Sequence, residues 1–149
     1  MPPGPLRVIH QRVPKPKPHG SFLAAEAGEL AGVSGSTIGQ WARWGYIRAS
    51  QSQADPHVYS VEDIAEAAIV HELLARGVKH GQIHRAIEHL PHYGAWPLSD
   101  ARLATTREDR PRLVLRENGE SYALCPRGWQ LMASTPPLDD VRLRLARTG

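Results

Sequence analysis

Residues 22–47, FLAAEAGELAGVSGSTIGQWARWGYI, constrain the fold of this chain more than any other segment. A first helix is expected over about 24–31 and stops at Gly32, because glycine readily adopts the positive φ of a tight turn. Ser34 can then cap a second helix, since its hydroxyl can accept from an early backbone N–H. Gly45 ends that helix. Two short helices joined by a Gly-containing turn predict a helix-turn-helix, whose second helix enters the major groove of DNA.

The residues that follow predict a wing and two further helices. Polar residues flanked by short apolar pairs predict a small β-hairpin wing over 48–58, after a recognition helix over 34–44. Ser60 begins a capping box that starts a third helix. Its predicted apolar face consists of Val61, Ile64, Ala65, Ala68, Ile69 and Leu73. A fourth helix carries Ile83, Ala86, Ile87 and Leu90 at helical spacing and ends at Pro91.

Three segments in this order, AGVSGSTIGQWARWGYI, VYSVEDIAEA and LLARGVKHGQIHRAIEHL, resemble the winged helix-turn-helix domain of the MerR superfamily. The resemblance covers roughly residues 21–90. Within the superfamily, TIGQWARWGYI resembles excisionase-like proteins and the DNA-binding domains of certain antitoxins more than it resembles the metal and drug sensors. Gly39 stands where the family usually has an arginine, and His57 stands where the wing usually has one.

The resemblance implies DNA contacts from the recognition helix and the wing. Hydroxyl, amide and guanidinium groups suit phosphate positioning and limited base readout. The predicted DNA-binding residues are Ser34, Ser36, Thr37, Gln40, Trp41, Arg43, Arg48, His57 and Tyr59. The alternative is a polar helix surface on a fold that no longer contacts DNA.

Charge and proline divide the chain into three predicted parts. Residues 1–19 carry four bases, no acid and six prolines, which predicts a flexible basic arm that either contacts nucleic acid or has no role. Residues 20–92 form the predicted winged helix-turn-helix domain. Residues 93–149 are expected to provide dimerisation or partner binding. The net charge of +3 and the pI near 9.4 permit DNA binding without requiring it.

The C-terminal part is predicted to contain a β-hairpin and a terminal helix. Alternating apolar residues over 112–124 flank Asn118-Gly119, the dipeptide typical of a type I′ turn. The final LDDVRLRLAR fits both helical and strand periods, and its acids at the start and arginines at the end favour a helix. Pro91 and Pro97 exclude the long helix through which typical MerR regulators dimerise.

Metal and catalytic chemistry find little support. His80 and His84 lie four residues apart with His89 and His92 nearby, but no cysteine or carboxylate joins them at a diagnostic spacing. We interpret these histidines as solvated and expect neither a metal nor a cofactor. Cys125, the single cysteine, has no local partner that would lower its pKa. No phosphate-binding loop or nucleophile elbow occurs, so the chain is not expected to be an enzyme.

These observations predict a mainly α fold with small β elements. We expect a cytoplasmic, dimeric, sequence-specific transcription regulator, because the chain has no secretory signal and no membrane-spanning run. One alternative is the antitoxin of a toxin–antitoxin pair, which binds a toxin through residues 93–149 and regulates its own operon. Another is a protein-interaction module that does not bind DNA.

Overall fold

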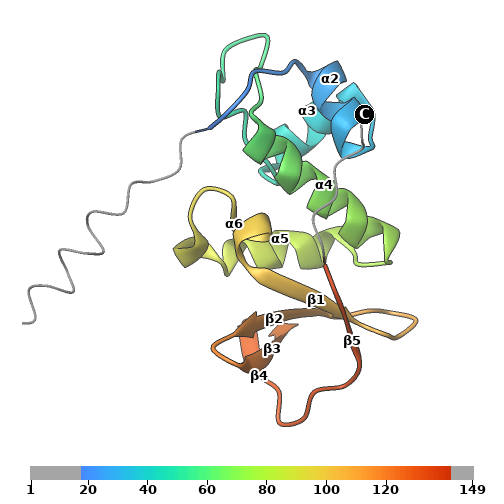
Figure 1. The fold of residues 1–149 in the computed structure, drawn as a ribbon. Coiled ribbons are helices and arrows are strands. Elements are labelled where there is room, and N and C mark those ends of the chain that lie inside the picture. The colour runs from blue at the N-terminus through green and yellow to red at the C-terminus, as the bar shows by residue number, and fades with distance from the viewer. Residues whose placement is uncertain (1–17, 142–149) are drawn as a thin grey trace, which may run out of the picture.

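The computed structural model describes residues 18–141, which form a helical half followed by a sheet (Figure 1). The helices are α2 (Ala24–Ala31), α3 (Gly35–Trp44), α4 (Val61–Ala75), α5 (His80–Glu88), the 3-10 turn η1 (Pro91–Tyr93) and α6 (Pro97–Asp100). The strands are β1 (Arg102–Thr106), β2 (Leu113–Glu117), β3 (Glu120–Cys125), β4 (Gly128–Leu131) and β5 (Leu138–Asp140). The prediction of a mainly α fold with small β elements is confirmed only in part, because the helices are followed by a five-stranded antiparallel sheet and the described residues form a mixed fold.

Helices α2 and α3 form the predicted helix-turn-helix. Gly32 ends α2 with φ 89°, as its lack of a side chain permits. Gly28 makes the close crossing of the two helices possible, because a Cβ at this position would lie 2.5 Å from the carbonyl oxygen of Val33. Sequence periodicity locates both helices but does not reveal this close approach.

Helix α4 lies at the centre of the molecule (Figure 1). Its predicted capping box is confirmed, because the Ser60 hydroxyl accepts from the Asp63 N–H and the Asp63 carboxylate accepts from the Ser60 N–H. The predicted single apolar face is wrong in two respects. Val61 is exposed, and the opposite side of the helix, including Ala67 and Val70, is also buried. A helix that is covered by other elements on nearly all sides does not concentrate its apolar residues on one face.

The predicted β-hairpin wing is reduced to one isolated bridge. Ser52 pairs with Val58 in antiparallel fashion, and residues 53–57 between them form an irregular loop. The wing is held at its base by Tyr59, whose backbone exchanges two hydrogen bonds with Phe22 ahead of α2.

Helix α5 ends at Glu88, two residues before the expected end, and Pro91 starts η1 instead of following a helix directly. The short α6 begins at Pro97. The two prolines thus divide residues 91–100 into short turns, as the exclusion of a long helix predicts.

The sheet has the strand order β4-β3-β2-β1-β5. The predicted hairpin is confirmed, because Glu117 pairs with Glu120 and leaves a two-residue loop in which Asn118 has φ 54° and Gly119 has φ 79°. Positive φ at both positions is the requirement of a type I′ turn. The predicted terminal helix is wrong where it can be checked, because Leu138–Asp140 pair with β1 as an edge strand; residues 142–149 lie outside the described residues.

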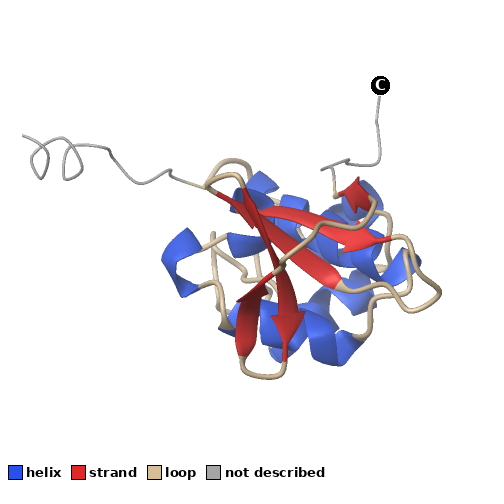
Figure 2. Ribbon diagram, turned by 90° about the horizontal axis from the view of Figure 1, so that it is seen from below, coloured by secondary structure: helices blue, strands red, loops and turns tan. Residues whose placement is uncertain are grey.

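The connection from β4 to β5 crosses the face of the sheet away from the helices (Figure 2). Because β4 and β5 occupy opposite edges of the sheet, their connection has to pass from one edge to the other. Ala104, Val114 and Ala123 are buried on this face, and their small side chains leave room for the crossing chain.

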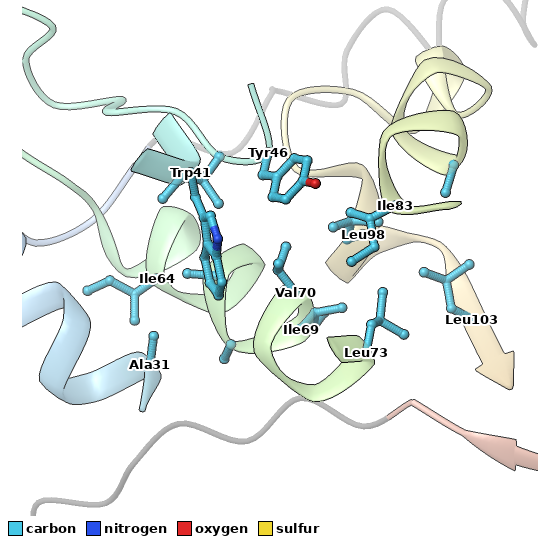
Figure 3. Packing of buried hydrophobic residues seen from close by; sticks show 14 of the residues in the cluster. Ala31, Trp41, Tyr46, Ile64, Ile69, Val70, Leu73, Ile83, Leu98 and Leu103 are labelled. Carbon is cyan, nitrogen blue, oxygen red and sulfur yellow. The ribbon is translucent and has the colours of Figure 1, made fainter. Parts of the chain in front are cut away.

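One hydrophobic cluster joins the helices to the sheet. Around α4 it contains Trp41 of α3, Ile83 of α5 and Leu98 of α6 (Figure 3), and it continues to Leu103 of β1. Arg76 at the end of α4 adds polar contacts by donating to Thr105 Oγ1 and to the carbonyls of Asp139 and Asp140. The predicted segments 20–92 and 93–149 therefore share a core. None of the helices in the described part of the chain is long and apolar enough to cross a membrane.

Candidate nucleic-acid interface

The recognition helix α3 has well-defined ends. Ser34 Oγ accepts from the Thr37 backbone N–H at 3.1 Å and donates to Thr37 Oγ1 at 2.9 Å. At the other end, Gly45 adopts φ 82° and donates to the Ala42 carbonyl. The predicted helix over 34–44 is therefore confirmed, with Ser34 as its N-cap.

The side chains of α3 divide into a buried and an exposed row. Ile38 and Trp41 are 0% and 3% exposed and face the core. Ser36, Gln40 and Arg43 are exposed on the outer side. The outer row supplies a hydroxyl, an amide and a guanidinium, which are groups that contact phosphates and base edges.

Two of the predicted DNA-binding residues are buried and are not part of the exposed row of α3. Trp41 is buried in the core, and Tyr59 is 1% exposed, so neither side chain is available to DNA in this structure. Burial, together with the charge of Asp63, raises the pKa of Tyr59, while the charge of Arg43 lowers it. These two aromatic residues therefore support the interface from behind.

Arg43 and His57 lie in one groove between α2, α3 and the wing. The groove has a volume of about 500 Å³ and is lined by Leu23, Ala24, Ala25, Gly39, Arg43, Asp55, Pro56, His57 and Tyr59. Gly39 adds no side chain to this lining, and a Cβ there would make only an ordinary contact with Arg43 Nη1, at 3.7 Å. The apolar start of α2 was not predicted as part of this surface, because its spacing resembles that of any short helix.

The comparison with protein families matches this part of the chain. Residues 23–90 fit the family described as MerR HTH family regulatory protein. This match supports a MerR-type helix-turn-helix over these residues, which are called the MerR-type domain hereafter. No curated protein and no solved structure that was compared with the chain gives a significant match.

Arg48 lies apart from the groove of the MerR-type domain. It lines a separate cavity of about 330 Å³ with the residues that follow α3, the end of α5 and the turns after Pro91. The structure therefore brings His57 to Arg43 but places Arg48 in a different cavity.

The end of α3 contributes an exposed aromatic residue that sequence reasoning did not assign to the interface. Trp44 is 43% exposed and makes edge contacts with Tyr46 and His80. The Tyr46 hydroxyl and His80 Nδ1 are 2.8 Å apart, and His84 also contacts the Tyr46 ring. Burial raises the pKa of Tyr46. The two histidines thus cover a tyrosine, and their four-residue spacing was the signal that they share a face.

Asp63 fixes the wing of the MerR-type domain to α4. Its Oδ2 accepts from the Ser50 N–H and Ser50 Oγ, and from the Ser60 N–H. Its Oδ1 accepts from Trp96 Nε1 at 2.9 Å. Ser50 and Ser60 lie at the two ends of the wing, and Trp96 directly precedes α6. The Asp63 carboxylate therefore links both ends of the wing to the start of the C-terminal half.

Proposed function

We propose that the chain is a sequence-specific DNA-binding transcription regulator that places α3 in the major groove. The observation that carries this proposal is the exposed row of Ser36, Gln40 and Arg43 on a helix capped at both ends within a MerR-type helix-turn-helix. The groove between α3 and the wing adds His57 beside Arg43. Leu23, Ala24 and Ala25 line the same groove as Arg43, and such an apolar surface suits an apolar base edge such as a thymine methyl.

The experiment measures affinity for DNA from the region upstream of the chain's own gene. The double substitution Gln40→Ala and Arg43→Ala should weaken binding by at least about thirtyfold, because each good base contact is worth about 1–3 kcal/mol. Arg110→Ala is the matched control, since it removes the same charge from an exposed loop between β1 and β2. Equal affinity of the double variant and the wild type would refute the placement of α3 in the groove.

Binding as a dimer is part of this proposal, because one recognition helix reads only a few base pairs. The mechanism is occlusion or distortion of a promoter without chemistry. Determination of the mass of the protein–DNA complex tests this point: two chains per site are expected, and one chain per site contradicts it.

The second candidate is an antitoxin, as the likeness to excisionase-like and antitoxin domains suggests. The observation that favours it is the sheet after the MerR-type domain, which offers a protein a surface separate from α3. Coexpression with the product of the neighbouring gene tests it. A stable complex that requires residues 93–149 supports this function, and the absence of a complex opposes it.

A further inference from the structure

Strand β4 presents unpaired backbone groups at the edge of the sheet. It pairs with β3 on one side, and no strand within residues 18–141 pairs with its other side. Ala123 is opposite Gln130, and the Met132 N–H donates to the Ser121 carbonyl. Because hydrogen-bonded pairs alternate in an antiparallel ladder, the N–H and C=O groups of Trp129 and Leu131 point outward.

The side chains of β4 lack the usual protection of an edge strand. Leu131 is 58% exposed, and it lies on the same face as Trp129, whose Nε1 donates to the His89 carbonyl. Free edges are normally protected by charges or prolines, and Gly128–Leu131 contains neither. This edge is therefore open and uncharged.

The opposite edge shows the contrast. Strand β5 carries Asp139 and Asp140, which form ion pairs with Arg107 and Arg116. Arg76 also covers their carbonyls. The two edges of one sheet thus differ in charge and in coverage, and only β4 can approach a neutral strand without desolvating a charge.

We propose that β4 binds β4 of a second copy of this chain in antiparallel fashion, about a two-fold axis at Gln130. Each outward Trp129 then forms a hydrogen-bonded pair with Leu131 of the partner subunit, and Leu131 packs beside the partner subunit's Trp129. At the axis, Gln130 lies opposite the partner's Gln130, and two amide side chains can bond to each other. The segment complements itself: its outward backbone groups can pair with those of a second copy, Trp129 and Leu131 can pack against each other, and no charges repel. These features favour a second copy of this chain over another protein as the partner of β4.

This arrangement deepens the proposed function, on which its biological role rests. The two-fold axis of an antiparallel strand pair is perpendicular to the sheet, so both copies keep their helices on the same face of the joined sheet. Trp129 contacts the end of α5 on that face, and the MerR-type domain lies on the same side (Figure 1). Both recognition helices are therefore on the side from which one DNA duplex can be approached.

The test uses opposite charges at the axis. Sedimentation of the full chain over a wide concentration range should show a dimer, and Gln130→Lys or Gln130→Glu should each raise its dissociation constant at least about fivefold at low salt. Mixing the two variants should restore dimers that contain one chain of each kind, and high salt should weaken both effects. Thr135→Lys and Thr135→Glu are the control pair, because Thr135 is exposed in the connection after β4 and should change nothing.

A monomeric wild type, or Gln130 variants that dimerise like the wild type, would overturn the interface. If these variants stay dimeric and still bind DNA, the proposed function stands without this interface. If they become monomeric and the mixture recovers the dimer, the interface is established. Whether dimeric binding is needed is then decided by DNA affinity, which should fall in each variant alone and recover in the mixture.

Discussion

Glu66 gives the fold a pH dependence that can be calculated. Its side chain is part of α4 and is 2% exposed. The carboxylate accepts from the backbone N–H groups of Leu98 and Ser99 at 3.0 and 2.6 Å, in the first turn of α6. Burial raises the pKa of Glu66 from 4.5 to about 7, although these hydrogen bonds act in the opposite direction.

The sign of the effect follows from the direction of this change. Because the pKa is higher in the folded protein, the folded state keeps a proton that the unfolded chain releases above pH 4.5. The contribution of Glu66 to stability is therefore fully present below pH 4.5 and is lost as the pH rises through 7. The interval between the two pKa values corresponds to about 3 kcal/mol in the free energy of unfolding.

The assay is urea unfolding of the wild type and Glu66→Gln between pH 4 and 8 at about 25 °C. The glutamine is uncharged throughout, so the difference between the two free energies should change by about 3 kcal/mol over this range in favour of the variant at high pH. Glu62→Gln is the control with the opposite sign. Burial opposes the change at Glu62, but hydrogen bonds from His19 lower its pKa overall, so its stabilisation is lost as the pH falls. Parallel profiles for the wild type and Glu66→Gln would refute this reasoning.

Three further predictions concern the N-cap of α3, the hydrogen bonds of Arg76, and residues 1–17. Ser34→Ala should lower the free energy of unfolding by about 1 kcal/mol in thermal or urea denaturation, because α3 loses its N-cap, whereas Ser36→Ala should have little effect. Arg76→Met should destabilise the chain by about 1–2 kcal/mol and accelerate amide exchange in β5, because three donors to Thr105, Asp139 and Asp140 are lost; unchanged exchange would contradict this, and Arg107→Met, at an exposed ion pair, is the control. Deleting residues 1–17, which retains the His19–Glu62 contact, should reduce the salt dependence of DNA affinity if the four bases contact phosphates, and an identical salt slope would exclude such contacts.

Local chemistry made much of the helical half predictable. Caps at Ser34 and Ser60 and the positive φ of Gly32 and Gly45 act within a few residues, and these features define α2, α3 and the start of α4. The same is true of the hairpin, because the Asn118-Gly119 turn imposes its own register.

The errors arose where distant contacts determine the structure. LDDVRLRLAR has the charge distribution of a helix, but β1 offers a free edge whose backbone groups Leu138–Asp140 satisfy. The buried position of Glu66 depends on α6, more than 30 residues away in the chain, so no local pattern indicates it. Trp41 and Tyr59 fit the composition of a binding surface. The three-residue spacing from Ile38 already indicates an inward position for Trp41, whereas only the packing around α4 shows that Tyr59 is a core residue.

The proposed function requires that α3 and the wing contact DNA. Its most direct test is to follow backbone amide NMR signals while DNA from the upstream region is added. The shifted signals should cluster at residues 34–44 and 53–57, with the largest changes near Gln40 and Arg43, while β1 and β2 should change little. Shifts confined to the sheet, or the absence of any shift at α3, would contradict it.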